Sequence, residues 1–181
     1  MKLFLLRHTE SLSNKKKIAA SVMDFGLSEK GKKDAKELVS TLSNNSYDFF
    51  IVSPLKRTIQ TIQPFLATLE KPRVITEPLT IERDLGVFTG TPDGTFTKHC
   101  KKNGLDRISY RPQNGESIAD VYERAKKLLV LIAEKYKGKS ILICGHEVFL
   151  HCLELLLTNE PVENFYLCKP LANGEIAEFE I

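Results

Sequence analysis

"LFLLRHTES", residues 3–11, places four apolar residues directly before an arginine and a histidine. A short continuous apolar run of this kind is typical of a strand that is buried on both faces, as in a parallel sheet. A secretory signal would need about 7–15 apolar residues and a small-residue cleavage site, but Arg7 ends this run after Leu6. We therefore expect a central strand with Arg7 and His8 at its carboxyl end, where open α/β sheets bind their ligands.

Strands and helices alternate along the rest of the chain. Three further apolar runs are expected to form strands: Phe49–Val52, Val74–Ile75 and Ile141–Cys144. Apolar residues recur at three- and four-residue intervals within 35–42 and 118–132, which is the spacing of amphipathic helices. This alternation predicts an α/β three-layer sandwich, with a mainly parallel central sheet flanked by helices. In the tail, the alternating residues after Asn173-Gly174 predict a C-terminal hairpin.

Local signals mark the ends of two of these helices. Ser117 is expected to be the N-cap of the helix over 118–132. In "SPLKRTIQTIQPF", residues 53–65, we expect Ser53 to be the N-cap and Pro54 to occupy the first helical position. Pro64 should end or kink this second helix, because proline lacks a backbone donor and clashes with the preceding turn.

The composition is that of an ordinary globular protein. A chain of 181 residues is most simply one domain, 1–181, with a sizeable core. A net charge of +3 gives no argument for nucleic acid, and no apolar run approaches the roughly 20 residues of a membrane span. Four cysteines lack CxxC or zinc-type spacing, so we expect reduced thiols in a cytoplasmic protein that binds neither nucleic acid nor membrane. The sequence leaves the oligomeric state open.

Charged and imidazole side chains follow the predicted strands at equivalent places. Arg7 and His8 follow the first strand, Arg57 lies one helical turn after "FFIVSP", and His146 follows "SILICG". The carboxyl ends of parallel strands share one edge of the sheet, so these residues can converge. Each arginine alone is most simply a surface residue. Two arginines and two histidines together would suit a dianionic group such as phosphate.

Six motifs occur in a fixed order along the chain: "LLRHTES" followed by Asn14, "DFGLSEKG" at 24–31, "SPLKRTIQT" at 53–61, "IERDLGVFTG" at 81–90, "NGES" at 114–117 and "ICGHE" at 143–147. Together they resemble the signatures of the histidine phosphatase superfamily, which includes the cofactor-dependent phosphoglycerate mutases. The first is similar to that family's Arg-His-Gly-(Glu)-(Ser/Thr)-x-x-Asn. The resemblance covers nearly the whole chain, and six motifs in order are far more specific than any one of them.

The resemblance implies a role for each residue of the predicted site. His8 would attack phosphorus as a neutral imidazole and form a phosphohistidine. Glu82 would protonate the leaving oxygen and then accept a proton from water, which calls for a raised pKa. Five residues would bind the phosphate or the substrate: Arg7, Asn14, Arg57, His146 and Glu147. No metal and no cofactor is implied, because the arginines supply the positive charge.

Two positions depart from the family's pattern. Thr9 stands where the family has glycine, and Glu147 stands where it has a small residue. Position 147 is implied to offer its backbone N–H to the phosphate, which glutamate can do. A carboxylate aimed into the site would repel the substrate, so we expect the Glu147 side chain to turn away, toward a cation or solvent. Thr9 is expected to need only a slightly roomier backbone.

The sequence therefore predicts a metal-independent phosphomonoesterase that acts on a small phosphorylated metabolite through a phosphohistidine. Two alternatives stay open. A phosphoglycerate mutase-type phosphotransferase would need a pocket that retains the phosphorylated intermediate and excludes water. A catalytically impaired phosphate-binding scaffold has Glu147 as its only support. Against it stands the retention of five residues: Arg7, His8, Arg57, Glu82 and His146.

The segment "KHCKKNGLDRISYR", residues 98–111, is basic. Charge runs of this kind are commonly solvated faces. The alternative is a cover over the pocket, in which one basic residue binds a second anionic group of the substrate. Five residues are candidates for this contact: Lys98, Lys101, Lys102, Arg107 and Arg111.

Overall fold

The strand that contains the first apolar run lies inside the sheet. In the computed structural model, which describes residues 1–181, β1 (Lys2–Arg7) pairs in parallel with β4 (Ser140–Gly145) along its whole length. β4 pairs in parallel with β2 (Phe49–Val52), and β2 with β3 (Val74–Thr76). β5 (Ile176–Glu180) pairs antiparallel with the other edge of β1. The resulting order, β3-β2-β4-β1-β5, confirms a mainly parallel sheet.

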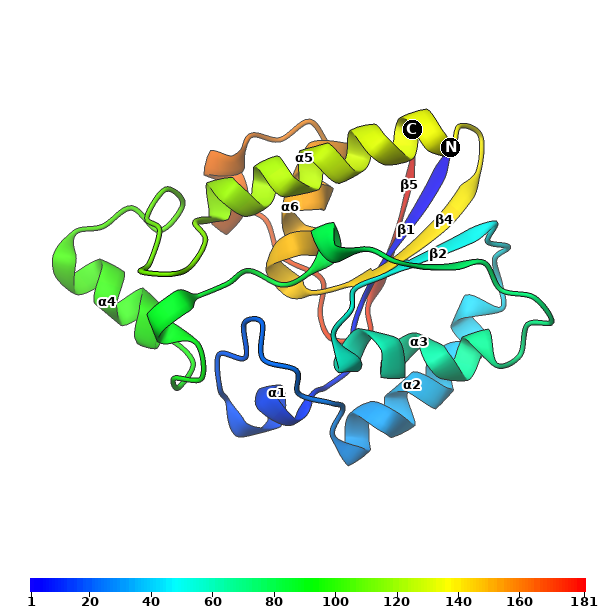
Figure 1. The fold of residues 1–181 in the computed structure, drawn as a ribbon, viewed down its shortest axis with the longest axis horizontal. Helices are drawn as coiled ribbons and strands as arrows, with labels where there is room; N and C mark the ends of the chain where they lie inside the picture. The colour runs from blue at the N-terminus through cyan, green and yellow to red at the C-terminus, as the bar shows by residue number, and fades with distance from the viewer.

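Helices cover both faces of this sheet (Figure 1). α2 (Glu29–Leu42) and α3 (Lys56–Leu66) pack on one face, and α5 (Ile118–Lys135) and α6 (Glu147–Leu157) on the other. Successive side chains of a strand point to opposite faces. Leu3 and Leu5 therefore pack with α5 and α6, while Phe4 and Leu6 pack with α2 and α3. The predicted three-layer α/β sandwich is confirmed.

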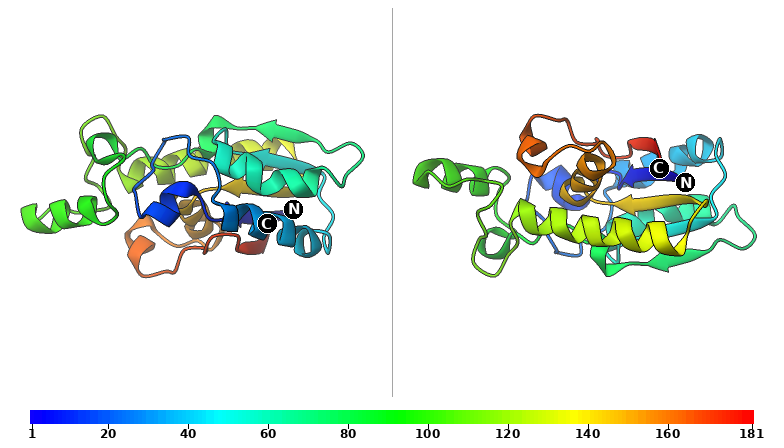
Figure 2. Two further views of the ribbon diagram at one scale, coloured as in Figure 1. Left: turned by 90° about the horizontal axis from the view of Figure 1, so that it is seen from below. Right: turned by 90° about the horizontal axis from the view of Figure 1, so that it is seen from above.

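Short elements gather beyond the carboxyl ends of the parallel strands (Figure 2). They are α1 (Leu12–Lys16), α4 (Thr95–Asn103) and two 3₁₀ helices, η2 (Gly86–Phe88) and η3 (Val162–Tyr166); a further 3₁₀ helix, η1 (Pro78–Thr80), follows β3. α4 projects from the layers at this end, and the two termini lie together at the other end, because β1 and β5 are neighbours. None of the helices is both long and apolar enough to cross a lipid bilayer.

Two local predictions are wrong, and one is confirmed. No C-terminal hairpin forms, because the chain just before Asn173 makes no strand and β5 pairs with the edge of β1 instead. Ser53 is not the N-cap of α3 and Pro54 is not its first residue, because α3 begins at Lys56 after Leu55. Pro64 lies in its last turn. The Ser53 hydroxyl bonds the ring of His146, 2.7 Å away. Ser117 is the N-cap of α5, as predicted, and accepts the N–H of Asp120.

Candidate active site

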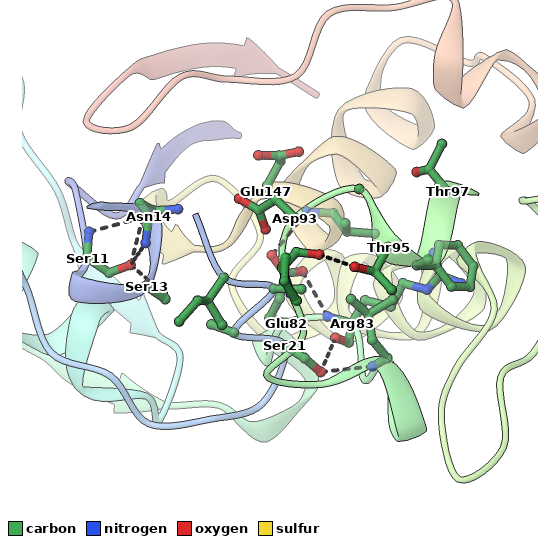
Figure 3. A pocket seen from close by; sticks show the side chains of 18 of the residues that line it. Ser11, Ser13, Asn14, Ser21, Glu82, Arg83, Asp93, Thr95, Thr97 and Glu147 are labelled. Carbon is green, nitrogen blue, oxygen red and sulfur yellow. Dashed lines mark hydrogen bonds between the residues drawn. The ribbon is translucent and has the colours of Figure 1, made fainter. Parts of the chain in front are cut away.

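The predicted site residues meet in a pocket of about 370 Å³ at the carboxyl ends of β1 and β4 (Figure 3). Six of them line it: Arg7, His8, Asn14, Arg57, Glu82 and Glu147. His146 is fully buried beside this lining, with its ring centroid 5.3 Å from that of His8. The sheet explains the convergence. Arg7 is in register with Gly145, so the residues that follow them, His8 and His146, leave the sheet side by side.

His8 is held as a neutral imidazole with one defined tautomer. Its Nδ1 lies 2.7 Å from the carbonyl oxygen of Thr9. Because a carbonyl oxygen can only accept, Nδ1 bears the proton and Nε2 is left with its lone pair. Burial, followed by the positive charge of Arg57, lowers the pKa of His8 from 6.5 to about 3. The side chain is therefore a free base throughout the neutral range, as a nucleophile requires.

Thr9 ties the end of β1 to the neighbouring helices. It is fully buried, its N–H donates to Thr61 Oγ1 of α3 at 3.0 Å, and its hydroxyl donates to the Gly31 carbonyl of α2 at 2.9 Å. α2 can come this close because residue 31 is glycine: a Cβ there would lie 2.0 Å from the carbonyl oxygen of Glu10. The two hydrogen bonds of Thr9 hold its backbone in place, and the carbonyl oxygen of this backbone sets the tautomer of His8.

Arg57 and His146 form one buried unit. Arg57 Nε donates to His146 Nδ1 at 3.1 Å, so His146 Nε2 bears the proton and donates to Ser53 Oγ at 2.7 Å. Burial, then the charge of Arg57, places the pKa of His146 well below 6.5. Both of its ring nitrogens are bonded to protein groups, so contact with a phosphate would require one of these bonds to be exchanged. In this structure His146 positions Arg57.

The Arg57 guanidinium is almost completely buried but still has donors to spare. Besides Nε, one Nη donates to the carbonyl of Met23 at 2.8 Å and the other to that of Ser21 at 2.9 Å. An arginine has five N–H donors, so each Nη retains one. Neither partner is a carboxylate, and the positive charge is therefore available to a ligand in the pocket.

Arg7 is engaged at both ends of its guanidinium. Nη1 donates to the carbonyl of Leu171 at 2.7 Å, and Nη2 lies 2.5 Å from Glu147 Oε2. The Nε of Arg7 is buried and has no hydrogen-bond partner. A buried donor without a partner costs about 1–3 kcal/mol. Its presence in a pocket that also holds His8 points to a ligand that supplies the missing acceptor.

The prediction that Glu147 turns away from the pocket is wrong, but its side chain does meet a cation, as predicted. Its side chain, 44% exposed, lines the pocket and pairs with Arg7, the same guanidinium that was predicted to bind phosphate. Glu147 is the first residue of α6, whose N-terminus lies at the carboxyl end of β4. A carboxylate is favourable at a helix N-terminus, and Arg7 is the cation within its reach.

The carboxyl group of Glu82 accepts hydrogen bonds from the backbone and has a raised pKa. Its two carboxyl oxygens accept from the backbone N–H of Arg83 at 2.8 Å and, more weakly, from that of Val148 in the first turn of α6 at 3.4 Å. Burial raises the pKa of Glu82 above its ordinary value, although the Arg83 N–H and the charges of Arg57 and Arg7 act in the opposite direction. A carboxyl group that keeps its proton at higher pH can protonate a leaving oxygen.

Asn14 forms another side of the pocket, away from Glu82 (Figure 3). Its Oδ1 accepts from the backbone N–H of Ser11 at 3.0 Å and from the Ser11 hydroxyl at 2.7 Å, in the capping box of α1. Because these bonds hold the oxygen, the amide NH₂ is the end of the side chain that is left for a ligand.

Several lining residues were not singled out from the sequence. They are Arg83, Asp93, Thr95, Thr97 and Tyr166, which lie on loops and on α4 and η3. Ser53 was predicted to be a helix N-cap, but its hydroxyl bonds His146 instead. No group of three or more His, Cys, Asp or Glu side chains is arranged to hold a metal ion.

A neutral histidine at the end of a central parallel strand, near two arginines and a carboxyl group whose pKa is raised by burial, defines a class of site suited to phosphoryl transfer. The sequence from residue 3 to residue 181 matches the profile of the histidine phosphatase superfamily (branch 1). The chain belongs to this family and is an enzyme of the phosphatase type.

Individual relatives agree with this assignment. Over 171 residues the chain is 31% identical to phosphoserine phosphatase 1 of Hydrogenobacter thermophilus, covering 92% of this chain and 80% of the relative. It is 32% identical to a 2,3-bisphosphoglycerate-dependent phosphoglycerate mutase of Treponema denticola, covering 76% of this chain and 56% of the mutase. A putative alpha-ribazole-5'-P phosphatase of Escherichia coli shares the fold, with a TM-score of 0.87, 21% identity, and coverage of 98% and 89% of the two chains.

The burial of His8 predicts a loss of stability in acid. Its pKa is about 3 in the fold and 6.5 ordinarily, so the unfolded chain binds an extra proton between these values. Stability that is present above pH 6.5 is therefore lost as the pH falls, at up to about 1.4 kcal/mol per pH unit. Between pH 7 and pH 5, the free energy of unfolding of His8→Gln, measured in urea, should fall by about 2 kcal/mol less than that of the wild type. Equal losses in the two proteins would contradict the buried neutral histidine.

The ion pair between Arg7 and Glu147 predicts that the carboxylate weakens phosphate binding. Glu147→Gln should bind inorganic phosphate about two- to fivefold more tightly at neutral pH, since a half-exposed ion pair contributes at most about 1 kcal/mol. Titration calorimetry on the two proteins measures this difference. Glu147→Gly should show the same gain, because position 147 still has its backbone N–H. Weaker binding in both variants would mean that Glu147 itself supports the anion.

Proposed function

We propose that this protein is a phosphomonoesterase that hydrolyses a small phosphorylated metabolite through a phosphohistidine at His8, without a bound metal. The single observation that supports it best is the hydrogen bond between His8 Nδ1 and the carbonyl of Thr9. It leaves Nε2 as an unprotonated nucleophile in a pocket beside Arg7 and Arg57.

The reaction would have two steps. In the first, His8 Nε2 attacks phosphorus, the bond to the ester oxygen breaks, and Glu82 gives its proton to the departing alcohol. In the second, the ionised Glu82 takes a proton from water, whose oxygen attacks the phosphohistidine. Phosphate then leaves, and His8 and Glu82 return to their starting forms. Using one carboxyl group for both proton transfers fits a group whose pKa is raised by burial.

Positive charge and hydrogen-bond donors would stabilise the phosphoryl oxygens in both transition states. The unpartnered Nε of Arg7, the two spare donors of Arg57 and the amide NH₂ of Asn14 are the groups available. His146 would act through Arg57, because its own nitrogens are already bonded.

Hydrolysis is favoured over phosphoryl transfer to a second substrate. A mutase must exclude water while its intermediate waits, whereas Glu147 on the pocket wall is 44% exposed. The Hydrogenobacter thermophilus relative, which matches 92% of this chain, is named a phosphoserine phosphatase, and a second phosphoserine phosphatase, from Entamoeba histolytica, shares the fold with a TM-score of 0.81 at 23% identity. Phosphoserine is therefore the first substrate to test. Formation of 2-phosphoglycerate from 3-phosphoglycerate would instead identify a mutase.

His8→Ala tests the nucleophile. Turnover of an aryl phosphate should fall below detection while the fold is retained, and the wild type should acquire acid-labile, base-stable label after brief exposure to labelled substrate. His99→Asn, on α4 and outside the pocket lining, is the control and should keep wild-type activity. Dialysis of the wild type against a chelator should leave its rate unchanged. Label on serine or aspartate, or a rate restored by added metal, would refute the mechanism.

Glu82→Gln tests the proton donor. Glutamine keeps an acceptor for the Arg83 N–H but has no transferable proton, so hydrolysis of alkyl phosphates should fall by about 10²–10⁴-fold. Aryl phosphates, whose leaving groups need less protonation, should lose much less in the phosphorylation step. Single-turnover measurements with both kinds of ester separate this step from hydrolysis of the intermediate. An equal loss for both would show that Glu82 has only a structural role.

A further inference from the structure

The pocket extends beyond the residues assigned to the phosphate. On the side of Glu82 that is away from Asn14, Arg83 and the α4 residues Thr95 and Thr97 line it (Figure 3). Arg107 and Tyr166 also line the pocket. We call Arg83, Phe96, Arg107 and Tyr166 the distal wall. It belongs to segments between β3 and α5 and to η3, which are separate from the strand ends that hold His8.

Arg107 is the unusual member of the distal wall. Its guanidinium carbon lies 3.9 Å from the centroid of the Tyr166 ring, which fixes the guanidinium plane on an aromatic face. Its Nε is buried without a hydrogen-bond partner. The adjacent carboxylate of Asp106 accepts from the backbone and hydroxyl of Ser109 instead. Arg107 therefore has the same feature as Arg7, namely an orphaned buried donor in a guanidinium that lines the pocket.

Arg83 adds a second positive charge without a carboxylate partner. It is 4% exposed, its Nε donates to the carbonyl of Glu116 at 2.8 Å, and its guanidinium carbon lies 4.6 Å from the centroid of the Phe96 ring. By contrast, Arg111 pairs with Asp120, and Arg124 pairs with Glu116. The two arginines of the distal wall form no salt bridge with a carboxylate.

The carboxylates that line the pocket form no salt bridge with the distal wall. Glu147 pairs with Arg7, and Glu82 accepts from backbone N–H groups. Asp93 is exposed and lies close to Glu147, whose charge contributes to raising the pKa of Asp93. Negative charge thus gathers near Arg7, and the distal wall is left positive.

We propose that Arg107, supported by Tyr166 and Arg83, binds a second anionic group of the substrate. The substrate class is a phosphomonoester that also bears a carboxylate or a second phosphate. This inference rests on the proposed function and names its substrate class. It also selects among the five basic residues of 98–111, because Arg107 alone lines the pocket, whereas Arg111 is paired with Asp120.

Substrate pairs that differ in the second anionic group test this inference. O-phosphoserine and O-phosphoethanolamine differ only in a carboxylate, and fructose 1,6-bisphosphate and fructose 6-phosphate differ in a phosphate. The wild type should prefer the first member of at least one pair. Arg107→Gln should lower kcat/KM for that member by about 10–100-fold, mainly through KM, since a hydrogen bond to a charged group contributes about 1.5–3 kcal/mol. For the second member, kcat/KM should stay within about twofold.

Two further variants separate recognition from folding. Arg111→Gln removes a charge from the same basic segment and should behave as the wild type. Tyr166→Leu removes the aromatic support and should reproduce part of the Arg107→Gln loss, whereas Tyr166→Phe should not. A wild type that hydrolyses both members of both pairs equally, or an Arg107→Gln variant that loses the same factor on all four, would overturn the inference and leave the proposed function intact.

Failure of the proposed function has a different signature. If the wild type hydrolyses no phosphate ester, calorimetry with the same four compounds decides the inference by binding alone. Loss of O-phosphoserine or bisphosphate affinity in Arg107→Gln, with O-phosphoethanolamine unaffected, would support the distal anion site. Equal affinities in the wild type and the variant would refute it.

Discussion

The parallel pairing of β1 with β4 is the constraint on which the site depends. Arg7 is in register with Gly145, and the N–H of His8 donates to the carbonyl of Gly145 at 3.1 Å. A slip of one residue would move every core side chain of β1 to the other face of the sheet. The observed register is what places the two histidines next to each other.

Burial in the pocket shifts the pKa values of His8 and Glu82 in the directions that the proposed chemistry needs. It disfavours charge, so the pKa of His8 falls and that of Glu82 rises. Arginine resists this effect because its ordinary pKa is above 12, and Arg57 remains a cation although its pKa is also lowered. One pocket therefore contains a free base, a carboxyl group with a raised pKa and fixed positive charge together. Their separate roles follow from intrinsic pKa values as well as from position.

Sequence reasoning predicted what depends on apolar runs and on motifs, and it failed where tertiary partners decide. The four parallel strands and the convergence of Arg7, His8 and Arg57 follow from apolar runs and their ends. The role of Ser53 did not, because its local signal is that of a helix cap, while its hydroxyl meets His146, which is far away in the sequence. The terminal strand was recognised as a strand, but its partner was not, since an alternating segment pairs with whichever sheet edge is free.

Glu147 and Arg107 show a further limit of sequence patterns. They also suggest how the pocket discriminates between a substrate and inorganic phosphate. A pattern locates a charged residue but gives no information on which charge its side chain meets, and here Glu147 meets Arg7 while Arg107 meets only an aromatic ring. A phosphate entering the pocket must compete with Glu147 for Arg7, which reduces the net gain from binding phosphate alone. A second anionic group at Arg107 has no carboxylate to displace. Under our proposals, a substrate with both groups is then held more tightly than the inorganic phosphate that it yields, so product release is favoured without weakening substrate recognition.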